Sequence, residues 1–119
     1  MHRRRCEREV GWLFSQHGYE AEVTKGSGDG GIDIFLKKNG KVSVVQCKRF
    51  THKAGPAVVR DMYGTMMAGN YEEAFVVCPA GFSDNAYDFS KNKKVRLIGL
   101  KGIMEMVDAV PDDIRSSGA

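Results

Sequence analysis

The sequence has no long hydrophobic run and few cysteines. None of its apolar runs approaches the ~18 residues of a membrane-spanning helix, and Met1-His2-Arg3-Arg4-Arg5 is followed by charged residues instead of the apolar core of a signal peptide. Cys6, Cys47 and Cys78 are odd in number, far apart and without a CxxC pair, which argues against a disulfide framework and a structural zinc site. We therefore expect a soluble, cytoplasmic chain in a reducing compartment, with no membrane segment.

A second full domain is also absent. The chain has 119 residues, of which 42% are apolar and 28% charged, as in one globular domain. A domain of this size buries roughly two-thirds of its unfolded surface, so it can hold a core without disulfides. Repeats, low-complexity tracts and long linkers are missing as well. We assign residues 1 to 107 to one domain and residues 108 to 119 to a polar C-terminal tail.

Basic charge is concentrated in one segment. The net charge is +3, but residues 1 to 104 hold 17 Lys and Arg against 11 Asp and Glu, a charge of +6. Residues 37 to 53 contain six Lys and Arg and one His, and no acid. This clustering suits a polyanionic partner such as nucleic acid. It also suits an ordinary solvated face, and charge alone leaves both open.

Hydrophobic periodicity predicts the element order αβββαβαβα. Apolar residues at helical spacing predict a helix over residues 3 to 17, and alternation predicts a strand over residues 19 to 23. The later elements are strands over 32 to 38, 41 to 48, 74 to 78 and 95 to 100, and helices over 59 to 67, 83 to 92 and 101 to 107. Tight turns among the first strands, and helices between the later ones, imply an α/β fold with a mixed central sheet flanked by helices.

A glycine loop lies between the first two predicted strands. Gly26, Gly28 and Gly31 fit the GxGxxG pattern of dinucleotide-binding folds, but that pattern needs a helix directly after it and here a strand follows. No Gly-Lys-Ser or Gly-Lys-Thr closes the segment, so a P-loop is absent too. We interpret these glycines as sites of backbone freedom, for a tight turn or for the close approach of a ligand.

The Asn39-Gly40 pair predicts a two-residue hairpin turn with a defined register. In this register Lys38 lies opposite Lys41, Phe35 opposite Val44, and Asp33 opposite Gln46. The two-residue period of the strand then puts Lys48 on the same face as Gln46, across from Gly31, which has no side chain to obstruct it. Ile32, Ile34, Val45 and Cys47 point to the opposite face. A bulge would change this register.

The predicted hairpin therefore gathers Asp33, Gln46 and Lys48 at one end. A carboxylate, a side-chain amide oxygen and a backbone carbonyl such as that of Cys47 supply the hard oxygen ligands that Mg²⁺ prefers. An ammonium beside them can orient or help deprotonate an attacking water and offset charge on a phosphate. This arrangement suits phosphodiester hydrolysis. An ordinary cross-strand cluster on the surface is the alternative, and the glycine at position 31 slightly favours a site.

At these residues the sequence resembles the catalytic domain of Mrr-like restriction endonucleases, a branch of the PD-(D/E)xK nuclease superfamily. Two segments carry most of the resemblance, Gly28-Asp29-Gly30-Gly31-Ile32-Asp33-Ile34 and Val44-Val45-Gln46-Cys47-Lys48-Arg49-Phe50. Residues 7 to 19 resemble the first helix of the family, residues 59 to 64 its central helix, and residues 82 to 89 a later helix. The resemblance spans about residues 6 to 107.

The resemblance implies a restriction-endonuclease-like αβββαβ core and Mg²⁺-dependent hydrolysis of DNA, with Mn²⁺ as a substitute. It makes Asp33 a metal ligand and Lys48 the catalytic lysine. Glu7 matches the first-helix glutamate that assists metal binding in relatives. Gln46 fits the Mrr branch but stands where the wider superfamily has an acid, which removes one negative charge from the metal site.

The basic segment supplies candidate DNA contacts. Arg49, His52, Lys53 and Arg60 are candidates for phosphate binding, and Gly30 and Gly31 permit close backbone approach. Each of these charges could equally be a solvated surface charge. Two alternatives to a DNA endonuclease stay open: a non-catalytic nucleic-acid-binding module on the same fold, and a nuclease for RNA or branched DNA. We expect a homodimer if both strands are cut, and a partner or a further domain for target recognition.

Overall fold

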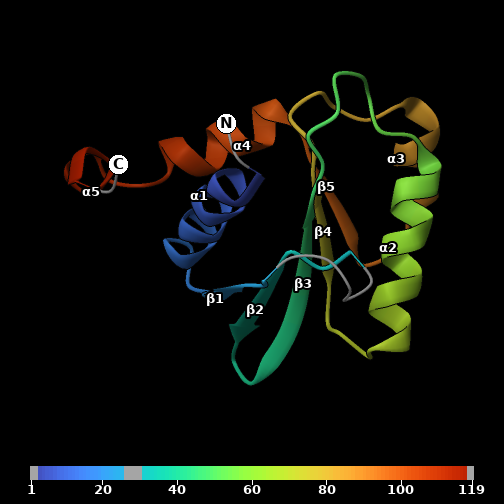
Figure 1. Ribbon diagram of the computed structural model, residues 1–119, viewed down its shortest axis with the longest axis horizontal. Helices are drawn as coiled ribbons and strands as arrows, with labels where there is room; N and C mark the ends of the chain where they lie inside the picture. Colours follow the sequence, from blue (N-terminus) through green and yellow to red (C-terminus); the bar gives the residue numbers. More distant parts are fainter. Residues whose placement is uncertain (1–2, 26–30, 118–119) are drawn as a thin grey trace.

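A five-stranded mixed sheet runs through the middle of the molecule (Figure 1), in a computed structural model that describes residues 3–25 and 31–117. The strands lie in the order of the chain: β1 (Glu20–Val23), β2 (Ile34–Lys38), β3 (Lys41–Cys47), β4 (Ala74–Val77) and β5 (Val95–Ile98). The first three are antiparallel, whereas β4 and β5 run parallel to β3. The predicted mixed sheet is confirmed.

Helices cover both faces of this sheet. α2 (Pro56–Ala68) and α3 (Asp84–Ser90) lie on one face, and α1 (Arg3–Ser15) and α4 (Leu100–Asp108) lie on the other (Figure 1). The element order matches the predicted one. A further short helix, α5 (Asp112–Ser117), forms within the segment that we assigned to the polar tail, and Val110 before it is buried. The division of the chain at residue 107 stays a prediction.

Local sequence signals explain where the helices on the first face begin and end. Pro56 begins α2, where its missing N–H costs nothing, and Gly69 is the C-cap that follows the last helical residue, Ala68. Ser83 caps α3, because its hydroxyl accepts the backbone N–H of Ala86 at 3.2 Å. Ser83 is therefore the N-cap of α3.

Two apolar cores fill the space between the sheet and its helices. The core under α2 and α3 contains Val44, Val59, Met62, Val76 and Phe82, among others. The core under α1 contains Val10, Phe14, Ile34, Leu36, Val45 and Phe75. Val44 and Val45, neighbours in β3, therefore point into different cores. All four residues of β4 are buried. A strand covered on both faces is expected to be continuously apolar, as β4 is.

The hairpin of β2 and β3 has the predicted register over most of its length. Lys38 pairs with Lys41 and Phe35 with Val44, and positive φ angles at Asn39 (55°) and Gly40 (79°) are those of the favoured two-residue turn. The register changes at Asp33. Ile34 lies opposite Val45, yet the backbone N–H of Asp33 also donates to the Val45 carbonyl, at 2.8 Å. Two residues of one strand thus oppose one residue of the other, which is a β-bulge.

The bulge corrects two of our predictions. Asp33 does not pair with Gln46, and Ile32 does not share a face with Ile34. Ile32 belongs to the core with Val44, whereas Ile34 belongs to the core with Val45. The extra residue in the bulged strand reverses the alternation of side chains before it, which explains the change. Val45 and Cys47 lie on the predicted side.

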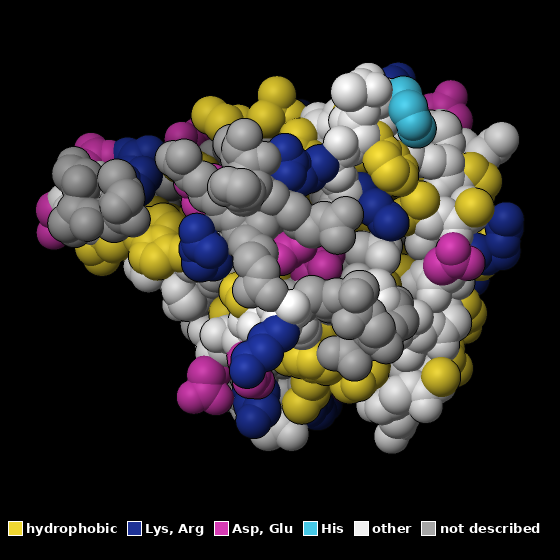
Figure 2. Space-filling model, viewed as in Figure 1, with side chains coloured by type: hydrophobic (Ala, Val, Ile, Leu, Met, Phe, Trp, Pro, Cys, Tyr) yellow, Lys and Arg dark blue, Asp and Glu magenta, His cyan; other side chains and the backbone are white. Residues whose placement is uncertain are grey.

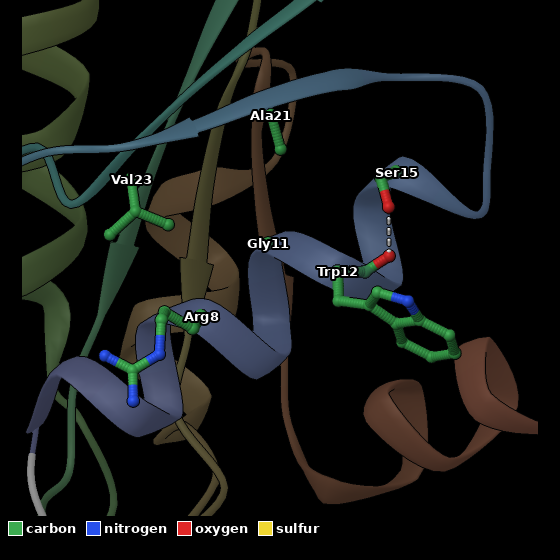
Figure 3. Close-up of a pocket in the computed structure, with 6 residues that line it drawn as sticks. All are labelled: Arg8, Gly11, Trp12, Ser15, Ala21 and Val23. Atoms are coloured by element: carbon green, nitrogen blue, oxygen red, sulfur yellow. Dashed lines mark hydrogen bonds between the residues drawn. The ribbon is translucent and has the colours of Figure 1, made fainter. Parts of the chain in front are cut away.

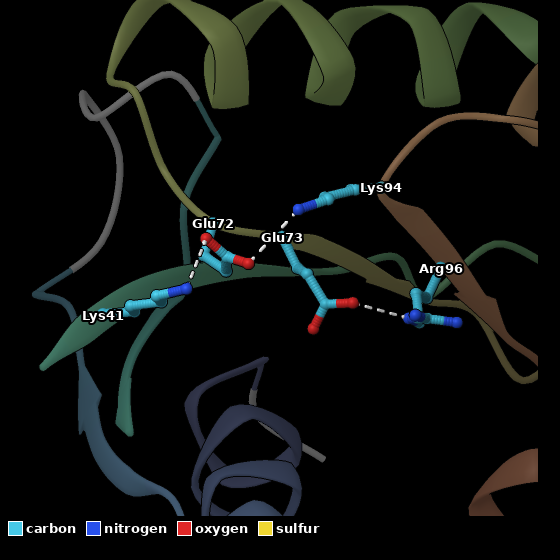
Figure 4. Close-up of polar contacts among 5 residues, drawn as sticks. All are labelled: Lys41, Glu72, Glu73, Lys94 and Arg96. Atoms are coloured by element: carbon cyan, nitrogen blue, oxygen red, sulfur yellow. Dashed lines mark hydrogen bonds and ion pairs between the residues drawn. The ribbon is translucent and has the colours of Figure 1, made fainter. Parts of the chain in front are cut away.

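Ion pairs join the strands at the end of the sheet where β4 and β5 begin (Figure 4). The Glu72 carboxylate lies 3.7 Å from the Lys41 ammonium and 3.2 Å from that of Lys94. Glu73 accepts a hydrogen bond from Arg96 Nε at 2.8 Å. These contacts link the starts of β3, β4 and β5 on the surface, at the opposite end of the strands from Gln46 and Cys47.

Candidate active site

The Asp33 carboxylate lies beside the end of β3, and Asp33 is the residue directly before β2. Its Oδ2 accepts the backbone N–H of Cys47 at 2.7 Å. In a regular hairpin that N–H would bond to a backbone carbonyl of the neighbouring strand. The β-bulge brings the side chain of Asp33 to this position instead, so a half-buried carboxylate is held directly beside the Gln46–Lys48 segment.

Gln46 presents a polar atom without a partner. The residue lies in β3 opposite Val76 of β4, and its Oε1 is buried with no hydrogen-bond partner within residues 3–25 and 31–117. A buried amide oxygen normally accepts a hydrogen bond or binds a cation, since leaving it unpaired costs free energy. Gln46 Oε1 is therefore the atom in this corner that most needs a ligand.

Gly31 makes room for Gln46. A Cβ built on Gly31 would overlap the side-chain amide nitrogen of Gln46, and the φ of Gly31 is +82°. Both observations explain a glycine at this position. We predicted that the missing side chain leaves room for Lys48. That was wrong, because the atoms that a Cβ on Gly31 would meet belong to the Gln46 side chain.

Glu7 brings a second carboxylate from α1 to the same corner. Its exposed fraction is 2%, and it has a polar or electrostatic partner. Burial, followed by the negative charges of Asp33 and Glu7 and by Cys6, raises the pKa of the Cys47 thiol. The Asp33 and Glu7 carboxylates thus both lie close enough to Cys47 to act on its thiol.

Lys48 follows directly after β3. Its backbone N–H donates to the Val77 carbonyl of β4 at 2.8 Å, which fixes the start of its side chain. Its ammonium nitrogen lies 5.6 Å from the centroid of the Phe50 ring. Phe50 in turn stacks on His52, with 4.9 Å between the ring centroids and 21° between the planes. Sequence analysis gave Phe50 no role, although its spacing of two residues from Lys48 in an extended segment was a usable signal.

The predicted DNA contacts fall into two places. Arg49, His52 and Lys53 are exposed on the segment between β3 and α2, next to Lys48. Arg60 is exposed on α2, where its guanidinium lies 5.8 Å from the Phe89 ring centroid of α3. Gly30 lies outside the described residues. Figure 2 shows acidic side chains near the centre of one face of the molecule with Lys and Arg side chains around them.

The possible metal ligands in this corner are carboxylate, amide and backbone carbonyl oxygen atoms. The part of the chain that the structure describes contains no group of three or more His, Cys, Asp and Glu side chains arranged to hold a metal ion. A cation at this corner would therefore need the Gln46 amide oxygen and a backbone carbonyl in addition to carboxylates. These are hard oxygen ligands, and together with the unpartnered Oε1 they fit Mg²⁺.

A separate hollow lies between α1 and β1 (Figure 3). It has a volume of about 210 Å³ and is lined by Arg8, Gly11, Trp12, Ser15, Ala21 and Val23. The Ser15 hydroxyl donates to the Trp12 carbonyl at 2.6 Å, so this polar group is engaged within the helix. The hollow shares no lining residue with the corner around Asp33 and Gln46.

The element order, the mixed sheet and the polar corner at the end of β3 define a restriction-endonuclease-like domain. The model of the family described as "Restriction endonuclease", the Mrr catalytic domain, matches residues 1–107, and the chain belongs to this family. No curated protein sequence matches the chain. Within the described residues, no helix combines the length and apolar character needed to cross a membrane.

Three solved structures share the fold. A crystal structure of a protein of unknown function, AF1548, has a TM-score of 0.75 and 17% identity over 87% of this chain and 64% of its own. The DNA modification-dependent restriction endonuclease AspBHI has a TM-score of 0.69 and 16% identity, over 96% of this chain and 31% of its own. The restriction endonuclease MspJI, solved with a 27-mer oligonucleotide, has a TM-score of 0.60 and 18% identity, over 95% of this chain and 28% of its own. This chain therefore spans less than two-thirds of each.

Proposed function

We propose that this chain is a metal-dependent DNA endonuclease domain of the restriction type, which hydrolyses phosphodiester bonds with Mg²⁺ or, as a substitute, Mn²⁺. One observation carries the proposal. The buried Oε1 of Gln46 has no hydrogen-bond partner within the described ranges, and it lies in the strand segment whose next residue is bonded to the Asp33 carboxylate. A cation would satisfy this oxygen and use the adjacent carboxylate.

Asp33, Gln46 and the Cys47 carbonyl would hold the ion, with Glu7 beside them. The bond from the Cys47 N–H to Asp33 Oδ2 orients the carboxylate and leaves its second oxygen as a ligand. When bound, Mg²⁺ supplies Lewis-acid stabilisation of a phosphate and acidifies a water molecule. Because Gln46 is neutral, the site has one negative charge fewer than a site with an acid at this position, and we expect modest metal affinity.

Lys48 supplies positive charge next to this corner. Strand alternation puts its side chain on the same face as that of Gln46, and the bond of its N–H to Val77 fixes its backbone. From there the ammonium orients the attacking water and offsets the charge that develops on the phosphate.

The support for DNA as the substrate is the family itself and the charge around the site. A solved protein with the same fold, MspJI, carries a 27-mer oligonucleotide. In this chain Arg49, His52 and Lys53 are exposed beside Lys48, and we assign them to phosphate contacts, with Arg60 of α2 and the backbone at Gly31 as further contacts. In this proposal, a partner or a further domain recognises the target, and a homodimer cuts both strands.

The first experiment is plasmid cleavage. Purified protein is incubated with supercoiled DNA in Mg²⁺, Mn²⁺ or EDTA, beside Lys48→Ala and the control Lys41→Ala, whose lysine is exposed at the far end of the hairpin. We expect metal-dependent cleavage that is lost in Lys48→Ala and kept in Lys41→Ala, with equal circular dichroism spectra. Equal cleavage by all three proteins would indicate a contaminant and refute the assignment of Lys48.

A non-catalytic nucleic-acid-binding module is the second candidate. The neutral Gln46 and the lack of a group of three His, Cys, Asp or Glu side chains in residues 3–25 and 31–117 favour it. Such a module would bind DNA in EDTA with an affinity that falls steeply with salt, and would cut nothing. Duplex DNA, branched DNA, single strands and RNA, tested side by side, separate this module from a nuclease with another substrate.

A further inference from the structure

The segment that follows Lys48 is tied to the fold at both ends. At its start, the Lys48 N–H is bonded to Val77 of β4. At its end, Ala54 is fully buried and forms a bridge with Phe82, with hydrogen bonds of 2.9 Å from the Ala54 N–H to Gly81 and from the Ser83 N–H to Ala54. In Figure 1 this segment forms the green loop above the ends of β3 and β4. The loop of residues 49 to 53 therefore has fixed ends.

Phe50 is the residue of this loop that connects the core with the candidate site. Its half-buried side chain packs against the core under α2 and α3. Its ring also lies 5.6 Å from the Lys48 ammonium and stacks on the imidazole of His52. The His52 ring is held by a hydrogen bond of 3.0 Å between its Nδ1 and the Lys53 carbonyl. The aromatic ring is thus fixed in position and orientation.

The ammonium of Lys48 lies over this ring. Within the described part of the chain it forms no hydrogen bond or ion pair, and the Phe50 ring is its one recorded polar or aromatic partner. A lysine side chain is a flexible four-carbon stem that samples many rotamers unless a contact selects one. An ammonium ion is attracted to the face of an aromatic ring within about 6 Å of its centroid.

We propose that Phe50 is a positioning residue, which holds the ammonium of Lys48 at the corner formed by Asp33 and Gln46. This proposal rests on the proposed nuclease function. Phe50 does not touch the substrate; its ring face selects the side-chain conformation in which the ammonium meets the reacting phosphate. The stack with His52 keeps the ring face turned toward Lys48. A residue that only filled the core under α2 and α3 would have no effect on Lys48.

Three variants separate the two roles. Phe50→Leu keeps an apolar side chain in the core but removes the ring, and Phe50→Tyr keeps the ring. Tyr19→Leu is the matched control, because Tyr19 is also half-buried against a core, the one under α1, and also has a lysine, Lys38, over its ring at 4.7 Å. Melting temperatures of all variants are measured first. If Phe50→Leu does not fold, the unbranched Phe50→Met replaces it.

Cleavage kinetics give the first readout. A cation–π contact of the usual strength corresponds to about a 2- to 30-fold effect. We expect Phe50→Leu to lower kcat within this range with KM unchanged, Phe50→Tyr to keep the wild-type kcat, and Tyr19→Leu to lower the melting temperature with kcat intact. Equal kcat values for wild type and Phe50→Leu would overturn the proposal. So would a loss in Phe50→Tyr as large as that in Phe50→Leu.

Nuclear magnetic resonance gives a readout that needs no activity. Lysines are dimethylated with ¹³C-formaldehyde, which keeps their charge, and the Lys48 signal is assigned by its absence in Lys48→Arg. We expect an upfield ring-current shift of this signal in wild type and Phe50→Tyr, and its loss in Phe50→Leu. A Lys48 signal without this shift in wild type would overturn the proposal. If wild type cuts no nucleic acid while the shift is present and depends on Phe50, the nuclease function fails and the contact stands.

Discussion

Replacement of Gly31 by alanine tests whether the glycine loop positions the Gln46 side chain. Gly31 has a φ of +82°, and a Cβ there would overlap the amide nitrogen of Gln46. An L-residue in the left-handed region costs about 1–2 kcal/mol. The overlap adds a second effect, because the Gln46 amide has to move. Gly40 is a matched control: its φ is +79°, and nothing lies within 4 Å of a Cβ built on it.

The two variants therefore share the backbone cost and differ in the displacement of Gln46. We expect Gly40→Ala to lose about 1–2 kcal/mol of unfolding free energy, which lowers the melting temperature of a domain of this size by about 3–6 °C per kcal/mol. Gly31→Ala is expected to lose at least as much. Loss of a residue that orients a metal ligand typically costs 10- to 100-fold in metal affinity or activity. We expect this loss in Gly31→Ala alone.

The assay combines thermal unfolding with cleavage rates over a Mg²⁺ titration, at a temperature where both variants are folded. Gly31→Ala should need more Mg²⁺ for half-maximal rate, and Gly40→Ala should match wild type. If Gly31→Ala keeps the wild-type rate and Mg²⁺ requirement, Gln46 does not depend on Gly31 and the reasoning is wrong. Equal losses of activity in both variants would point to a general effect of destabilisation and refute it as well.

Three further predictions concern single charges and thiols. Gln46→Glu adds a carboxylate to the proposed metal site, so it should lower the Mg²⁺ concentration for half-maximal cleavage, and an unchanged titration would contradict the ligand assignment. Burial raises the pKa of the Cys47 thiol, so iodoacetamide at pH 8 should modify Cys47 slowly in the folded protein and rapidly after unfolding, as measured by mass spectrometry of peptides. The hydrogen bond from Lys94 and the charge of Lys41 lower the pKa of Glu72 from 4.5 (Figure 4). Its ion pairs therefore stabilise the fold above the unfolded-state pKa and lose this effect as the pH falls through the lowered value, so Glu72→Gln should lower the melting temperature at pH 7 but not at pH 2.

Much of the fold follows from local patterns in the sequence. The order of helices and strands could be predicted because each element shows its own hydrophobic period and has a stop signal nearby, as at Gly18 and Gly69. The hairpin register followed from Asn39-Gly40, because a two-residue turn with positive φ at both positions admits one pairing. Burial of β4 followed from its continuous apolar run.

The bulge at Asp33 could not be predicted in this way. It depends on two hydrogen bonds that a regular hairpin does not have. The Val45 carbonyl accepts the backbone N–H of Asp33, and the Asp33 carboxylate accepts the backbone N–H of Cys47. Neither residue type signals this exchange in the sequence. The predicted members of the site still gather at one end of β3, because both contacts hold Asp33 close to the strand. What changed is the glycine contact, which is with Gln46 and not with Lys48.

The polar corner depends on these departures from a regular sheet. A regular hairpin would bond the Cys47 N–H to a backbone carbonyl and leave Asp33 as an ordinary cross-strand side chain. With the bulge, the carboxylate replaces that carbonyl and becomes part of the strand pairing. A carboxylate held by a backbone N–H keeps its orientation. The central strand β3 therefore also fixes Asp33, the first proposed metal ligand. Gly31 makes room for the Gln46 side chain, and the ring of Phe50 positions the ammonium of Lys48.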